Sequence, residues 1–106
     1  MVTTVVLSFL AGFWGGNGLP YFVAGSTGDG RNPGPFADSA AGNVLVGWVM
    51  LVVAALFWHF AHVPRHPSAG WSALALGVLA VGLIHSRTWR HNPWPWRRPA
   101  ALRLPE

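Results

Sequence analysis

Histidine is the residue type in this chain best suited to chemistry, and three of its five histidines lie close together in sequence. His59, His62 and His66 could offer imidazole nitrogens to a metal ion or a haem. No acidic residue lies near them in sequence, and a zinc site commonly needs three or four ligands. The alternative is that these histidines are amphipathic side chains at the surface of a membrane.

A haem held between two helices would need His85 as its second ligand, and helix geometry opposes this. His59 is about 6 Å from the linker that joins its helix to the next, at about 1.5 Å per residue. On the same scale His85 is about 20 Å from that linker. The two rings would therefore lie near opposite membrane surfaces, and we predict no cofactor.

Three polar side chains lie within otherwise apolar segments: Asn17, Asn43 and His85. Polar groups at membrane depth are costly and often mark function. All three fall toward the same end of their helices, where Asp38 also lies, so these four residues form a candidate polar cluster. Each also has a local alternative, because asparagine can cap a helix or bond a broken backbone, and histidine can reach the interface.

The sequence predicts no enzyme. It has no cysteine and three carboxylates, and no serine, histidine and aspartate have a spacing that suggests a hydrolase. The glycine-rich run from Gly12 to Gly18 follows no strand, so it is not a phosphate-binding turn.

Three long apolar stretches without a charged residue must position these side chains: Val2–Gly28, Asn43–Val63 and Trp71–Ser86. A helix of about 20 apolar residues crosses a membrane, and charged residues make up only 9% of the chain. We predict an all-α integral membrane protein of one domain with three transmembrane helices. The expected helices cover residues 2–24, 43–63 and 70–87, followed by an irregular basic tail over 88–106.

The first helix contains residues that disfavour helical structure. Glycines at 15, 16 and 18 and a proline at 20 flank Asn17, and proline removes a helical donor while its ring crowds the preceding turn. We therefore predict a break or kink near Asn17–Pro20. Either the helix ends near Gly16 and the remainder lies at the interface, or neighbouring helices cover the break.

Short signals define the other helix ends. Asn43 is a candidate N-cap of the second helix, with Asp38 and Ser39 as competitors. Pro64 ends that helix at Val63, and Ser68 is the candidate N-cap of the third. The short linker predicts that the second and third helices are antiparallel neighbours.

Small residues recur at four-residue spacing, as in Gly12 with Gly16 and Ala73 with Gly77. Such pairs allow close approach of helix backbones in lipid. We expect them to pack helices within the chain rather than to form a dimer interface.

All seven basic residues are arginine, and their distribution predicts orientation. With three crossings, six arginines share one side of the membrane and Arg65 alone is on the other. The positive-inside rule then puts the N-terminus outside and the C-terminus in the cytoplasm. The first residues carry no basic side chain and no Ala-x-Ala cleavage site follows, so we expect a retained helix rather than a signal peptide.

The tail interleaves arginine, tryptophan and proline. Such residues bind an anionic membrane surface or a partner protein, and membrane attachment explains the charge without nucleic acid. The candidate lipid or partner contacts are Trp89, Arg90, Trp94, Trp96, Arg97 and Arg98.

The first half of the chain resembles an uncharacterised family of small bacterial membrane proteins. The resemblance lies in the segment Asn17-Gly18-Leu19-Pro20-Tyr21-Phe22, a glycine-containing loop that ends in Pro35-Phe36, and the helix start Asn43-Val44-Leu45-Val46-Gly47-Trp48. Tyr21 stands where that family has histidine. The resemblance implies a multi-pass protein of the bacterial inner membrane and adds no activity.

From these features we expect a non-catalytic accessory or scaffold subunit of a larger membrane complex, respiratory or of the cell envelope. Two alternatives stay open. One is a small homo-oligomeric transporter or channel lined by Asn17, Asn43 and His85. The other is a metal- or haem-handling membrane protein that uses His59, His62 and His66.

Overall fold

The computed structural model describes residues 1–89 of the chain. It contains three long helices and one short 3₁₀ helix: α1 (Val2–Ser26), α2 (Ala40–Phe60), η1 (Val63–Arg65) and α3 (Pro67–Thr88). Each long helix has the length and apolar composition to cross a membrane. The chain is therefore a small three-span membrane protein of the all-α class, as the sequence predicts.

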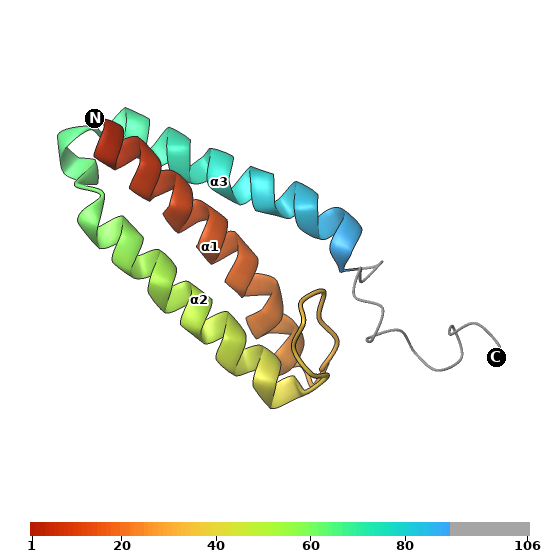
Figure 1. The fold of residues 1–106 in the computed structure, drawn as a ribbon. Coiled ribbons are helices and arrows are strands. Elements are labelled where there is room, and N and C mark those ends of the chain that lie inside the picture. The colour runs from red at the N-terminus through yellow and green to blue at the C-terminus, as the bar shows by residue number, and fades with distance from the viewer. Residues whose placement is uncertain (90–106) are drawn as a thin grey trace, which may run out of the picture.

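The three helices form a layer in which α1 lies between α2 and α3 (Figure 1). α1 and α3 run in one direction and α2 in the other. We call the end with residues 27–39 and the last turn of α3 the loop end, and the end with residues 61–66 the linker end. α2 and α3 are antiparallel in direction, as expected, but both pack on α1 and contact each other little. At the linker end Trp58 and Trp71 do meet, with ring centroids 5.0 Å apart.

The predicted break in the first helix is wrong. α1 is helical from Val2 to Ser26, with Pro20 inside it. A proline inside a helix is tolerated in a membrane when neighbouring helices cover the surrounding backbone. Here α2 and α3 cover α1 from two sides, so the helix continues despite the missing donor.

The glycines of α1 are contact residues rather than helix breakers. A Cβ atom on Gly12 would collide with the backbone carbonyl of Leu74 in α3, and one on Gly77 with the carbonyl of Phe9 in α1. On the other side of α1, a Cβ on Gly18 would lie 2.8 Å from the Gly47 oxygen in α2. The prediction that the small residues pack helices within the chain is confirmed for these contacts, because the absence of side chains lets the backbones touch.

The helix ends differ from the predicted ends by a few residues. Ser39 is the N-cap of α2, and its Oγ accepts a hydrogen bond from Gly42 N at 3.0 Å. Asn43 is therefore not the cap. α2 ends at Phe60 because His62 adopts a left-handed conformation with φ 54°, and α3 begins at Pro67, ahead of Ser68.

Candidate functional site

A pair of polar side chains joins α1 to α3 at membrane depth. His85 Nε2 lies 2.7 Å from Asn17 Oδ1. The other end of the same amide, Asn17 Nδ2, donates to Met50 Sδ in α2 at 3.2 Å. Because the amide nitrogen points to the sulfur, its oxygen is the acceptor, and His85 Nε2 carries the donated proton. Asn17 thus contacts both neighbours of α1.

Tyr21 lies one turn after Asn17 and is 4% exposed. Its ring packs edge-to-face on three others, with centroid distances of 5.2 Å to Trp89, 6.1 Å to Phe36 and 6.5 Å to His85. Such edge-to-face contacts stabilise aromatic clusters. The cluster connects the last turn of α3 to the loop through α1. The Tyr21 ring therefore packs the loop and the end of α3 onto α1.

A second polar network fastens the loop to α2. Asn43 is 1% exposed, and its Nδ2 donates to the backbone oxygens of Asp29 at 3.0 Å and Arg31 at 2.8 Å. Asn43 Oδ1 accepts from Asn32 Nδ2 at 3.2 Å, and Asn32 Oδ1 accepts from Gly34 N at 3.1 Å. Two buried asparagines therefore satisfy the backbone of a loop that has no regular structure of its own.

The acidic residues of the loop lie at its surface. Asp29 accepts hydrogen bonds from the Arg31 guanidinium, with Asp29 Oδ2 and Arg31 Nη2 3.0 Å apart. These hydrogen bonds hold the pKa of Asp29 below its ordinary value. The pKa of Arg31 is raised by its hydrogen bond to Asp29 and, more weakly, by the charge of Asp38. Asp38 is exposed.

The four residues of the candidate polar cluster thus fall into separate groups. Asn17 and His85 bond to each other, whereas Asn43 belongs to the loop network. Asp38 lies on the loop surface near Arg31. All four are at the loop end or in the spans beside it, but they do not form a single site.

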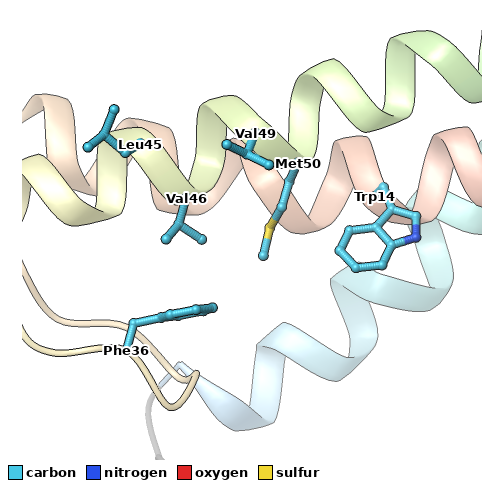
Figure 2. A pocket seen from close by; sticks show the side chains of 6 residues that line it. All are labelled: Trp14, Phe36, Leu45, Val46, Val49 and Met50. Atoms are coloured by element: carbon cyan, nitrogen blue, oxygen red, sulfur yellow. The ribbon is translucent and has the colours of Figure 1, made fainter.

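An apolar groove lies beside Asn17, between α1, α2 and the loop. Its volume is about 330 Å³, and the surface that faces it is wholly apolar. Figure 2 shows Val46 and Met50 pointing into the space between Phe36 and Trp14. The groove is lined by Trp14, Phe36, Leu45, Val46, Val49 and Met50.

The histidines at the linker end do not come together. His59 packs against Phe60, with ring centroids 4.9 Å apart, and His62 is held in the left-handed conformation that ends α2. In residues 1–89 no three histidine, cysteine, aspartate or glutamate side chains are grouped to hold a metal ion. The metal-binding alternative gains no support from this arrangement.

Sequence reasoning missed two residues that complete these networks, Asn32 and Met50, and noted Tyr21 without predicting its contacts. Asn32 precedes Pro33-Gly34, a pattern typical of a turn closed by the asparagine side chain, and could have been found. Nothing local marks Met50. Of the predicted tail contacts, Trp89 packs on Tyr21, whereas Arg90, Trp94, Trp96, Arg97 and Arg98 lie outside the described residues.

Comparison with known proteins places the chain in no family. No protein-family model matches it, and no curated protein or solved structure matches it either. Its resemblance to small bacterial membrane proteins stays a prediction.

Proposed function

We propose that this protein is a non-catalytic accessory subunit that holds a partner's transmembrane helix against α3. The observation that carries the proposal is Gly82. Among the glycines of the three helices, Gly82 alone has open space where a side chain would stand. Glycine within a helix costs about 0.5–1 kcal/mol relative to alanine, and at Gly82 no close contact with the rest of residues 1–89 offsets that cost.

Gly82 belongs to a row of mostly small, exposed residues along α3. The spacing alternates between three and four residues, which places them on one helix face. Rows of this kind bring helices together in lipid, where burial of apolar surface gives little drive for association. The row consists of Ser72, Ala75, Leu79, Gly82 and Ser86, all of them exposed.

The layered arrangement supports the same role. α1 is covered on two sides, while α2 and α3 pack mainly on α1 and contact each other little. Within residues 1–89, the outer face of α3 is therefore left uncovered and can receive a further helix. The arginine-rich tail follows α3, and in our proposal it faces the cytoplasm, where its arginines and tryptophans contact anionic lipid or the same partner.

Site-directed crosslinking tests this proposal cleanly, because the chain has no cysteine of its own. We would replace Gly82 with cysteine, attach a thiol-reactive photo-crosslinker such as a benzophenone maleimide, irradiate native membranes and measure the mass of the product. Leu56→Cys, on the exposed face of α2, is the matched control. A Gly82-specific product with another protein supports the proposal.

The other outcomes are equally informative. A Gly82-specific product of twice the chain mass would instead favour the homo-oligomer. Equal labelling from Leu56→Cys and Gly82→Cys, or no product, would overturn both. The channel alternative draws less support from the geometry, because Asn43 is 1% exposed and its donors are already bonded to the loop.

A further inference from the structure

The apolar groove has the size and lining of a small-molecule site. Its volume of about 330 Å³ lies within the range of about 300–1,000 Å³ that is common for ligand pockets. Aromatic rings, Trp14 and Phe36, stand at its two ends, and aliphatic side chains of α2 line the wall between them (Figure 2). A flat apolar molecule would contact all of these surfaces.

One polar group lies directly behind the wall of this groove. Asn17 Nδ2 donates to the sulfur of Met50, the same side chain that lines the groove. A thioether is a weak acceptor, so this donor has a poor partner at membrane depth. Met50 is also unbranched and flexible, and a change of its rotamer would open the amide to the groove. The other end of the amide is held in place by His85.

We infer that the groove binds a small aromatic molecule that carries a carbonyl oxygen, such as a quinone or an aromatic ketone. Asn17 Nδ2 donates to the carbonyl oxygen in place of Met50 Sδ. The ring of the ligand packs between Trp14 and Phe36. This inference does not depend on the proposed role of Gly82, which lies on α3.

The depth of Asn17 selects this ligand over a phospholipid. Asn17 precedes the end of α1 by nine residues, about 14 Å at about 1.5 Å per residue. A helix of 25 residues is about 37 Å long, against a hydrocarbon core of about 30 Å. A centred α1 thus puts Asn17 about 10 Å inside the core on these dimensions. Phospholipid ester carbonyls lie at the edge of the core, whereas a free apolar ketone can enter it.

Photo-crosslinking with benzophenone, itself an aromatic ketone, tests the site directly. The whole protein in phosphatidylcholine nanodiscs would be irradiated with the probe and the labelled residues mapped by mass spectrometry. We expect label on Met50, Val46 or Trp14 that menadione, a naphthoquinone, removes by competition. Label spread evenly over lipid-facing residues such as Leu56 and Leu83 would overturn the inference, as would loss of the label on addition of further phospholipid.

The hydrogen bond has its own test, because 2-methylnaphthalene has the ring system of menadione without its carbonyls. Menadione should compete about 3- to 10-fold more strongly, the range expected for one net hydrogen bond. Equal competition by the two compounds would refute the role of Asn17. Asn17→Leu should remove the difference between the two compounds.

Two further variants keep the test sound if Asn17→Leu fails to fold. Met50→Leu conserves volume and removes the competing acceptor, so menadione should bind more tightly, by about fivefold if the lost bond is worth about 1 kcal/mol. Val46→Trp should fill the groove and abolish labelling, whereas Leu56→Trp on the exposed face of α2 should not. Unchanged labelling in Val46→Trp, or weaker menadione binding in Met50→Leu, would contradict the proposal.

Discussion

The middle of α1 and its loop end are fixed by different forces. In the middle, glycines bring the backbones of α1, α2 and α3 into contact, as at Gly12 with Leu74 and Gly18 with Gly47. At the loop end, asparagine side chains bond to backbone oxygens, and Tyr21 gathers the rings around it. The comparison teaches that close packing suffices where the backbone is already helical, whereas an irregular loop at a membrane surface needs side-chain hydrogen bonds.

The largest effect should come from filling a glycine contact in the middle of α1. Gly12→Leu puts a side chain against the backbone of Leu74, and we expect a loss of about 3 kcal/mol in the free energy of unfolding. Gly82→Leu is the matched control, because no atom of the described residues outside this turn of α3 lies within 4 Å of a Cβ at that position. It should leave the purified chain as stable or slightly more stable. Unfolding in mixed micelles with increasing dodecyl sulfate, followed by circular dichroism, measures both. Equal effects of the two variants would refute the contact.

The next effect concerns the loop end. Asn43→Ala removes two donated hydrogen bonds and the acceptor for Asn32, and we expect a cost of about 2 kcal/mol. The loss should be local, so protease sensitivity of residues 27–39 should rise while the helical signal stays unchanged. Leu45→Ala, at an exposed position in the same helix, is the control. A loop that stays as protected in Asn43→Ala as in Leu45→Ala would show that packing alone holds it.

Two buried hydroxyl groups of α1 show whether a side-chain hydrogen bond adds to the stability that close packing gives. Thr4 Oγ1 donates to the backbone oxygen of Ala61 at 2.6 Å, so Thr4→Val should cost about 1 kcal/mol. Ser8 is equally buried, but its Oγ has no hydrogen-bond partner within residues 1–89, so Ser8→Ala should be neutral or stabilising. The same micelle titration measures both variants. A reversed order would mean that burial, rather than the hydrogen bond, decides the effect.

The smallest effect should be the pH dependence of the loop. The folded-state pKa of Asp29 is lowered by its hydrogen bonds to Arg31. The stabilisation is therefore present above the unfolded-state pKa of Asp29 and is lost as the pH falls through its folded-state value. Hydrogen exchange of residues 27–39 should rise at acidic pH, and Asp29→Asn should remove that rise. Because the pair is exposed, the change should be small and should weaken further in high salt.

The membrane-spanning class, the number of helices and the use of small residues as contacts could be predicted from the sequence. Charge-free apolar stretches and four-residue glycine spacing are patterns of residues that are close together in the sequence. The break near Pro20 was predicted wrongly for the same reason. A rule about isolated helices cannot include the two neighbours that cover α1.

The sequence predicted which polar residues belong to the candidate site, but not which of them bond to one another. Asn17, Asn43 and His85 were singled out because polar groups in apolar segments need partners, and all three have them. Which residue bonds to which depends on contacts between positions 17 and 85 or 32 and 43. No local pattern encodes such pairings, and Met50 is an ordinary apolar residue until the fold places it beside Asn17.

By itself, the sequence determined that this chain has three segments that lipid can dissolve as helices, because hydropathy and length are properties of each segment alone. The tertiary structure decided that α1 lies between the other two, that Asn17 bonds His85, and that a groove opens beside them. The helix order, this hydrogen bond and the groove all depend on which helix faces meet. Glycines that allow close backbone contact determine which faces those are.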